Sequence, residues 1–504
     1  MLLINNIKVG IDHSEDDIRK KIEKKLRHPV SSFSIYRKSL DARKTPVYVY
    51  SVLVEIEDEK KYLDKDVSLY VREDLDPEFI KTDRTCAVIG YGPSGIFSAY
   101  RLSQAGFRVM VFEKGKRISE RVKDVERFFE EGILDERSNV QFGEGGAGTF
   151  SDAKLTTRIK DRYIAYITDI LIRHGADPSI AYENHAHVGT DHIRKIIADI
   201  TDHLIAEGVE FHFEEELTDI HLGEDRKVTG FQTDKGSYSC DHLLLGIGHS
   251  SHDTFRMLKE KGVHIEPKDI AIGFRVEHPQ QMIDERQTGS IVTKANEYFL
   301  RYKGEKGVYS FCMCPGGIVI PAMSEHETIV TNGMSYSSRD SGIANSAILI
   351  QIPKEEFDDG FEYLKKIEKD AYDYSGSYKA LSQNISDFMK GELNPLIFSS
   401  TYPLGTVSYD FNRFFNEKDL KIIKEAFEVF DRQIPGFIEK GIMVGPETRS
   451  SCPVRINRNG HMQSVNTPGL YPMGEGAGYG GGIMSCSLDG IRVANEIICN
   501  HEKI

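Results

Sequence analysis

The chain of 504 residues lacks several features that would assign it to a class at once. Its seven cysteines are odd in number and widely scattered, which argues against a disulfide framework and for a reducing compartment. No apolar run reaches the ~18 residues that a membrane span needs. The start, Met1 to Asp12, has neither the basic residues nor the apolar core of a signal peptide. These absences predict a cytoplasmic protein that does not enter a membrane.

Basic residues are fewer than acidic residues. The chain has 64 Lys and Arg residues against 78 Asp and Glu, a net charge of −14. This balance argues against a general nucleic-acid binder or a membrane-surface protein. Residues 17–44 depart from it, with ten Lys or Arg against three acids. This basic segment either docks RNA, an acidic partner or a nucleotide phosphate, or it is a solvated helix face with a domain contact.

The length suggests about three domains, and there is no internal repeat or low-complexity linker. We predict a small N-terminal domain over residues 1–80. We predict a nucleotide-binding α/β domain over 84–265 and 441–504, because strands and helices alternate there. Residues 266–440 mix strand-like runs, such as 290–293, with polar helices, such as 416–433. They are predicted to form an inserted α+β substrate or cap domain.

The N-terminal block has the element order β-α-β-β-β. An extended start, Leu2–Val9, leads to Ser14, which is typical of a helix N-cap because three acids follow it. The helix is expected to end near Arg27. Strand-like runs follow, and the order suggests a small ferredoxin-like α+β domain.

A dinucleotide-binding pattern follows this block. A short apolar strand, Cys86–Ile89, leads into Gly90-Tyr91-Gly92-Pro93-Ser94-Gly95 and a helix over 96–105. A second strand, 109–112, ends at Glu113, which lies 23 residues after Gly90. In such a unit the glycines allow a tight turn and close approach of a pyrophosphate to the helix N-terminus. The acid accepts ribose hydroxyls, which favours FAD or NAD over NADP.

The C-terminal part indicates which of the two is bound. A strand ends in Gly474-Glu475, a glycine-rich run continues to Gly482, and a helix starts at Ile483. FAD enzymes of the glutathione-reductase type resemble this arrangement, with the acid near the ribityl chain and the helix N-terminus near the flavin pyrimidine. A second GxGxxG pattern that is complete with its first strand, helix, second strand and acid is not found, so a separate NAD(P)H domain is not expected.

By analogy with such FAD enzymes, three further features of the sequence are consistent with an FAD site. The glycine-rich run 143–148 is expected to line the pyrophosphate or ribityl chain, although a surface loop is the plain alternative. Arg121 is either a phosphate-pairing arginine or a solvated helix charge. The strand that leads to Gly248 resembles the one that returns to the FAD site. The predicted cofactor-binding residues are Gly90, Gly92, Pro93, Ser94, Gly95, Glu113, Lys114, Arg121, Gly145, Gly146, Gly148, Thr149, Gly248, Gly474, Glu475, Gly481, Gly482 and Ile483.

Taken together, these motifs resemble the bacterial family usually labelled uncharacterised FAD-dependent dehydrogenases, glutathione-reductase-like flavoproteins with one dinucleotide-binding domain. The resemblance covers nearly the whole chain and includes residues 36–43, 138–152, 187–191, 312–317, 331–335 and 447–451. In the family pattern a Gly stands where this chain has Ala153, a change that costs nothing unless that position needs a positive φ. The resemblance implies an FAD fold and redox chemistry, and it supplies no substrate.

The candidate catalytic residues each have a plainer alternative. Cys312 and Cys314 point to the same face of a strand, so they are either a redox pair near the flavin or two small buried residues. They are too few ligands for a closed metal site, and no metal is predicted. His187 is either a general acid or base or a structural histidine. Arg449 either offsets negative charge on flavin or substrate or holds the inserted domain.

The sequence thus predicts an α/β protein with a Rossmann-like FAD-binding domain, split by an inserted domain and preceded by the N-terminal domain. The leading function is hydride transfer between flavin N5 and a small organic substrate, with NADH or NADPH as a candidate transient electron donor. An RNA-modifying flavoprotein and a non-catalytic flavin-bearing sensor or assembly protein are the alternatives. The sequence leaves the substrate and the oligomeric state open.

Overall fold

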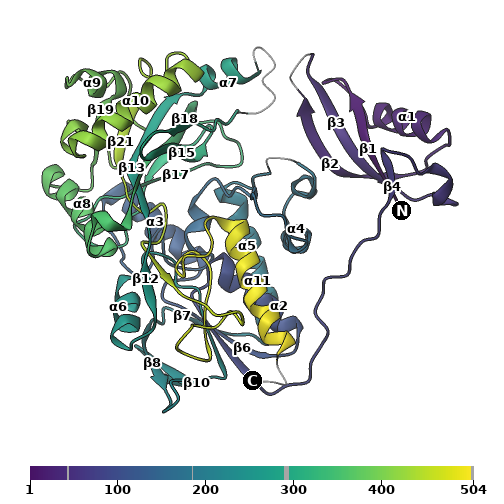
Figure 1. The fold of residues 1–504 in the computed structure, drawn as a ribbon, viewed down its shortest axis with the longest axis horizontal. Helices are drawn as coiled ribbons and strands as arrows, with labels where there is room; N and C mark the ends of the chain where they lie inside the picture. Colours follow the sequence, from purple (N-terminus) through teal and green to yellow (C-terminus); the bar gives the residue numbers. More distant parts are fainter. Residues whose placement is uncertain (42–44, 184–185, 289–294, 501–504) are drawn as a thin grey trace. The chain divides into compact units, whose positions relative to one another are not determined.

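The computed structural model describes residues 1–41, 45–183, 186–288 and 295–500 (Figure 1). The chain divides into two compact units, Met1–Asp76 with Lys154–Val188, and Pro77–Ala153 with Gly189–Ile504. Residues 154–188 therefore group with the N-terminal segment, although the sequence assigned them to the nucleotide-binding domain. The strand-like run 290–293 lies outside the described residues. No described helix is both long enough and apolar enough to cross a membrane.

The first unit contains a four-stranded antiparallel sheet with the order β2-β3-β1-β4. Its elements are β1 (Leu2–Val9), α1 (Glu15–Leu26), β2 (Phe33–Asp41), β3 (Val47–Val54), η1 (Glu59–Tyr62) and β4 (Val67–Leu69), followed by α4 (Tyr163–Arg173) and η3 (Pro178–Ala181). The predicted cap at Ser14 is confirmed, since Ser14 and Asp17 form a capping box and α1 ends at its C-cap Arg27. Ile18 and Ile22 bury the inner face of α1 in the core of this unit.

The first part of the second unit is a parallel sheet with the order β23-β11-β5-β6-β7. Its strands are β5 (Thr85–Ile89), β6 (Arg108–Glu113), β7 (Glu210–Phe213), β11 (His242–Leu245) and β23 (Leu470–Pro472). The central strands are continuous apolar runs because both faces of a parallel sheet are covered. The helices of this part are α2 (Pro93–Gln104), α3 (Ile118–Glu131), α5 (Thr190–Ala206), α6 (His252–Glu260) and α11 (Ile483–Cys499), and β8 (Leu217–Leu222), β9 (Val228–Thr233) and β10 (Ser237–Ser239) form an antiparallel meander.

The second part is a seven-stranded sheet with the order β14-β15-β18-β13-β21-β19-β20. Its strands are β13 (Ile270–Pro279), β14 (Arg301–Lys303), β15 (Gly307–Cys314), β18 (Ile343–Ile352), β19 (Ala380–Asn384), β20 (Thr406–Ser408) and β21 (Ile442–Glu447). The sheet is accompanied by α7 (Gln280–Thr288), α8 (Gly360–Ser375), α9 (Ile385–Lys390) and α10 (Glu417–Gln433), and apolar side chains between them form a large core. The predicted helix at 416–433 is confirmed, with Asn416 as its N-cap.

The sheet of the second part continues past the predicted boundary between residues 440 and 441. β21 pairs with β13 and β19, so the chain leaves the sheet only after Glu447. Two smaller pairs complete the unit, β12 (Ile265–Pro267) with β22 (Val454–Ile456) and β16 (Ile318–Pro321) with β17 (Thr331–Met334). Pairing between β12 and β22 ties the entrance of the inserted segment to its exit.

Candidate functional site

The turn between β5 and α2 brings Gly90, Gly92, Pro93, Ser94 and Gly95 together as predicted. A Cβ on Gly95 would lie 2.1 Å from the carbonyl oxygen of Gly90, so only glycine permits this turn. Gly92 is the N-cap of α2 and supplies no side-chain cap, and Pro93 is the first helical residue. The first amide groups of α2 are therefore arranged as in helix termini that bind anions.

Glu113 ties this turn to two other loops. Its carboxylate is buried at the end of β6. One oxygen accepts the N–H of Tyr91 at 2.9 Å, and the other accepts those of Gly115 and Gly143, each at 2.9 Å. The next residue, Lys114, turns away, since its ammonium group pairs with Glu216 at 3.0 Å. Glu113 thus holds the edge of the site in shape through backbone donors.

The glycine-rich loop, residues 143–148, contacts the N-terminal ends of α2 and α11. Gly145 and Gly146 have positive φ values of 86° and 63°. A Cβ on Gly146 would lie 2.9 Å from Cα of Gly92, and a Cβ on Gly148 would lie 3.0 Å from Cγ1 of Ile483. The loop therefore lies close to the N-termini of both α2 and α11. Three segments that are far apart in the sequence meet at this point.

Arg121 has a different place from the one that the sequence suggested. Its side chain is fully buried and donates to the loop at five points. The acceptors are the carbonyl oxygens of Asn139 (2.8 Å), Val140 (3.0 Å), Gly143 (3.2 Å) and Glu144 (2.7 Å) and the hydroxyl of Thr149 (2.8 Å). Because all three guanidinium nitrogens are engaged, Arg121 shapes the loop and is neither a phosphate partner nor a solvated charge.

Ala153 has a positive φ, which is the case in which a side chain at this position carries a cost. Its φ is +50°, in the left-handed region that disfavours residues with a Cβ. Ala153 therefore stands at a position that suits glycine.

The C-terminal motif supplies the second helix start. α11 begins at Ile483, and its N-cap Gly482 has no side-chain cap. A Cβ on Gly248, Gly481 or Gly482 would meet nothing within 4 Å, so this edge is open. Burial raises the pKa of the neighbouring Glu475 to about 7, with Lys268 opposing the shift.

Sequence reasoning missed the residue that fixes this motif. Asp489, on α11, accepts the N–H of Gly474 at 2.8 Å. The same carboxylate pairs with Arg458 at 2.9 and 3.0 Å, and that guanidinium lies 3.6 Å from the ring centre of Tyr479. The available signal was an acid between Leu488 and Ile491 in the buried first half of the helix, because a buried acid needs a partner.

Cys312 and Cys314 lie at the end of β15, but the strand is not regular there. The pairing with β18 shifts register between Phe311 and Cys314, and Cys312 has φ +44°. A bulge therefore interrupts the regular alternation from which the placement of the two side chains was predicted. The contact with Cys312 and burial raise the pKa of the Cys314 thiol well above its ordinary value. All seven cysteines lie in the described ranges, and none forms a disulfide.

A buried ion pair that the sequence did not reveal supports the bulge. Arg275, in the middle of β13, donates through Nη1 to the carbonyl oxygen of Cys312 at 2.8 Å. Its Nε lies 2.6 Å from Glu447, and its other donors reach Asn332 (2.7 Å) and Asn345 (3.0 Å). An arginine within an apolar strand was the signal, because such a charge is buried only when it is paired.

Arg449 joins the two parts of the second unit. Its guanidinium pairs with Glu368 at 2.7 and 3.0 Å and donates to Ser324 at 2.5 Å and Ser250 at 3.2 Å. These contacts favour the alternative in which Arg449 holds the inserted segment. His187 belongs to the first unit, whereas the other candidates belong to the second. In the described ranges no group of three or more His, Cys, Asp or Glu side chains is arranged to hold a metal ion.

Comparison with known proteins supports the nucleotide-binding assignment. Residues 88–146 match the NAD(P)-binding Rossmann-like domain, and residues 269–450 match the family described as FAD-dependent protein, C-terminal domain-like. Residues 1–55 match a domain of unknown function. The match over residues 269–450 supports FAD as the cofactor.

Solved structures are only distantly similar. L-proline dehydrogenase from P. horikoshii has a TM-score of 0.36 and 13% identity, over 84% of this chain and 95% of that one. A geranylgeranyl bacteriochlorophyll reductase-like protein from Thermoplasma acidophilum has a TM-score of 0.36 and 14% identity, over 84% and 80%. Scores below 0.5 carry no argument about function.

A bacterial relative matches nearly the whole chain. An uncharacterized protein of Clostridium beijerinckii (strain ATCC 51743 / NCIMB 8052) is 40% identical over 524 aligned positions. The alignment covers 98% of each chain. The chain therefore belongs to the same family as this Clostridium beijerinckii protein, with a Rossmann-like domain and an FAD-dependent C-terminal-like domain.

Proposed function

We propose that the protein is an FAD-dependent oxidoreductase that transfers a hydride between flavin N5 and a small organic substrate. One observation carries the proposal. Two helix N-termini without side-chain caps, those of α2 and α11, meet at a glycine-rich loop beside an open edge at Gly248, Gly481 and Gly482. This donor set suits a long dinucleotide whose phosphates need backbone N–H groups and whose rings need unobstructed backbone.

The residues at this edge fit FAD in a definite order. The amide groups of Gly92 to Gly95 would hold the pyrophosphate, and Glu113 would accept the adenosine ribose hydroxyls through its remaining lone pairs. Glu475 would contact the ribityl chain, and the N-terminus of α11 would face the flavin pyrimidine. When bound, FAD supplies reversible two-electron redox chemistry.

The chain itself would contribute electrostatics and proton handling. The uncapped start of α11 stabilises negative charge placed beside it, which favours a reduced ring. Glu475, with a pKa of about 7, can hold or release a proton at its carboxyl oxygen near neutral pH. Cys312 and Cys314, next to the buried Arg275, are candidate partners in electron transfer, and His187 remains a candidate acid or base.

The test is an anaerobic titration of the purified, FAD-loaded protein with NADH and with NADPH, followed by the flavin absorbance band. Bleaching by either nicotinamide would identify the donor and leave an acceptor to be found. A band that stays oxidised with both would direct the search to substrates or protein donors. A flavin that no donor reduces would contradict the enzyme proposal and favour a sensor or assembly protein.

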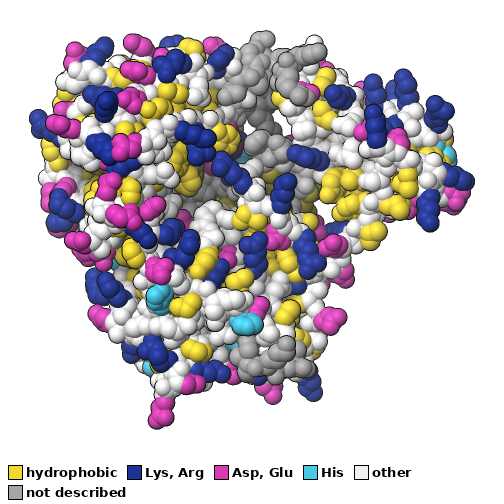
Figure 2. Space-filling model, in the orientation of Figure 1, with side chains coloured by type: hydrophobic (Ala, Val, Ile, Leu, Met, Phe, Trp, Pro, Cys, Tyr) yellow, Lys and Arg dark blue, Asp and Glu magenta, His cyan; other side chains and the backbone are white. Residues whose placement is uncertain are grey.

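An RNA-modifying flavoprotein is the second candidate, and one observation favours it. Lys20, Lys21 and Lys24 are exposed on α1 in the first unit. Figure 2 shows Lys and Arg side chains interspersed with Asp and Glu over the visible face. A filter-binding assay with total tRNA at 0.15 M salt tests this candidate, and retention below micromolar protein would support it.

A further inference from the structure

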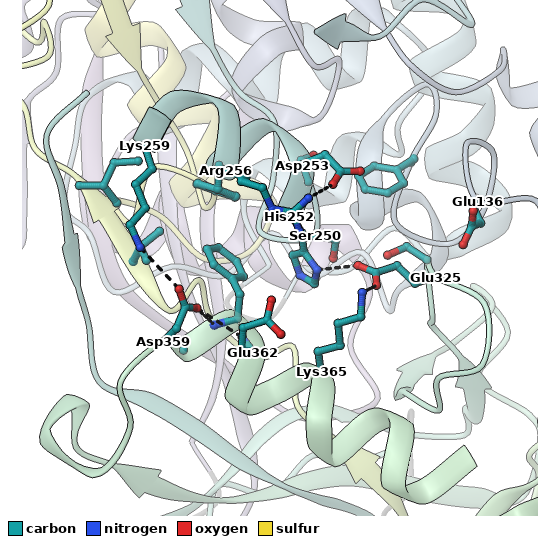
Figure 3. A pocket seen from close by; sticks show the side chains of 18 of the residues that line it. Glu136, Ser250, His252, Asp253, Arg256, Lys259, Glu325, Asp359, Glu362 and Lys365 are labelled. Carbon is teal, nitrogen blue, oxygen red and sulfur yellow. Dashed lines mark hydrogen bonds and ion pairs between the residues drawn. The ribbon is translucent and has the colours of Figure 1, made fainter. Parts of the chain in front are cut away.

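A cavity with a volume of about 600 Å³ lies within the second unit, outside the glycine-rich edge described above (Figure 3). One face of α6 and the first turns of α8 line it, together with the loop residues Glu136, Arg137, Phe142, Ser324 and Glu325. The volume is within the range of sites for small organic ligands. Lys114, which follows Glu113, is also in its wall, so the cavity adjoins the candidate FAD site.

One wall holds an oriented histidine. Nδ1 of His252 lies 2.5 Å from Oε1 of Glu325, and Nζ of Lys365 lies 2.6 Å from Oε2 of the same carboxylate (Figure 3). Although burial opposes it, the contacts with His252 and Lys365 hold the pKa of Glu325 well below its ordinary range. An ionised carboxylate only accepts hydrogen bonds, so Nδ1 of His252 carries a proton. The contact with Glu325 therefore fixes the orientation of the His252 ring.

Aromatic rings provide an apolar surface beside this histidine. The ring of Phe361 lies 4.9 Å from that of His252 and 4.8 Å from that of Phe255, measured between ring centres. Phe142 lines the cavity as well, and the ammonium group of Lys114 lies 3.9 Å from its ring centre. The cavity therefore offers aromatic faces, which attract both apolar groups and cations.

The charges around the cavity leave an excess of acid. The basic groups in its wall each have an acidic partner: Lys114 with Glu216, Arg137 with Asp234, Arg256 with Asp253, Lys259 with Asp359, and Lys365 with Glu325. Glu136, Asp358 and Glu362 also line the cavity, and within the described residues they pair with no Lys or Arg. A concave site with uncompensated carboxylates attracts cations and repels anions.

We propose that this cavity binds a small organic cation, an amine that carries an apolar ring. Its ammonium group faces the carboxylates of Glu136, Asp358 and Glu362. Its ring packs against Phe142, Phe255 and Phe361. The proposal does not depend on hydride transfer, because binding can be measured without any redox reaction.

The experiment uses benzylamine as the probe, with benzyl alcohol and benzoate as neutral and anionic analogues of similar shape. Binding to the FAD-saturated full-length protein at pH 7.5 is measured by saturation-transfer NMR and calorimetry. We expect a Kd on the order of 1 mM for benzylamine, about that of a well-seated fragment. Benzyl alcohol is expected to bind at least fivefold more weakly, and benzoate not measurably.

A matched pair of variants tests whether the amine binds in this cavity. The triple variant Glu136→Gln, Asp358→Asn, Glu362→Gln removes three exposed carboxylates from the cavity rim, and we expect its Kd to rise roughly fivefold or more. The control, Glu207→Gln, Glu224→Gln, Glu428→Gln, removes three exposed carboxylates that do not line the cavity and should bind as the wild type does. Circular dichroism checks that each variant is folded.

Three results would overturn the proposal. Equal binding of benzoate and benzylamine would remove the charge argument. An unchanged Kd in the rim variant would place the amine elsewhere. Displacement of benzylamine when FAD is added to flavin-free protein would assign the cavity to FAD itself and leave the flavin proposal intact.

Discussion

The two parts of the second unit are stabilised internally by different kinds of contact. At the glycine-rich edge, Glu113 accepts the N–H of Tyr91, only 22 residues away, and glycines let backbones touch. Inside the seven-stranded sheet, Arg275 pairs with Glu447, 172 residues away, and both side chains are buried. The Gly90–Gly95 turn is shaped by local backbone geometry, whereas the interior of the seven-stranded sheet depends on charge pairing between distant residues. Local geometry leaves a readable pattern in the sequence, whereas distant pairing does not.

The largest effect should come from a substitution in the Gly90–Gly95 turn. In Gly95→Ala, the new Cβ would lie 2.1 Å from a backbone oxygen that has no freedom to move, so the turn must open. We expect the FAD bound per purified chain to fall at least tenfold, as measured from the flavin absorbance after denaturation. Gly10→Ala is the control, because a Cβ there meets nothing within 4 Å. Normal flavin content in Gly95→Ala would refute this account of the turn.

Substitutions in the buried ion pair of the seven-stranded sheet should lower the free energy of unfolding. Glu447→Gln leaves the buried guanidinium of Arg275 without a counter-charge, which costs about 3–5 kcal/mol of unfolding free energy. Replacing both partners, as in Arg275→Met with Glu447→Leu, should recover most of that loss. Urea unfolding measures both. A single variant as stable as the wild type would mean that the pair contributes nothing to the difference between the regions.

Glu475 links the two kinds of region, because it lies in the glycine-rich edge and desolvation raises its pKa, as it does for an interior carboxyl group. Its pKa is raised from 4.5 to about 7 in the folded protein, so folding favours the protonated form. Stability is therefore full below about pH 4.5 and is lost as the pH rises towards 7. Relative to Glu475→Gln, flavin-free wild type should lose about 2 kcal/mol over this interval in urea unfolding. Parallel pH profiles would contradict the shift.

The smallest effect belongs to the first unit. Ser14→Ala removes the capping box of α1 and should cost about 1 kcal/mol of unfolding free energy. Because Ser14 belongs to the other compact unit, flavin content should not change. A combined thermal-unfolding and absorbance measurement checks both statements, and loss of flavin in this variant would show coupling that the account does not contain.

Much of the fold was predictable because it depends on neighbours in the sequence. The cap at Ser14, the strand and helix around Gly90 to Gly95 and the helix that starts after Asn416 each have their signals within a few residues. The place of β21 was not predictable, since an apolar strand can join either sheet and only its pairing with β13 decides.

The candidate site was predictable in part for the same reason. The glycines that meet at the two helix starts follow from their motifs. The role of Arg121 depends on carbonyl groups 18 to 23 residues further on, which no local pattern specifies. The bulge at Cys312 depends on Arg275, on another strand. The cavity beside His252 depends on α6, α8 and the loop with Glu325, which only the folded chain brings together.

The most direct test of the central claim is the flavin stoichiometry of the purified wild-type protein, after incubation with excess FAD and removal of the free cofactor. The account predicts one FAD per chain, with an absorbance band in the visible range that Gly95→Ala lacks and Gly10→Ala retains. A colourless wild-type protein that takes up no FAD would contradict it.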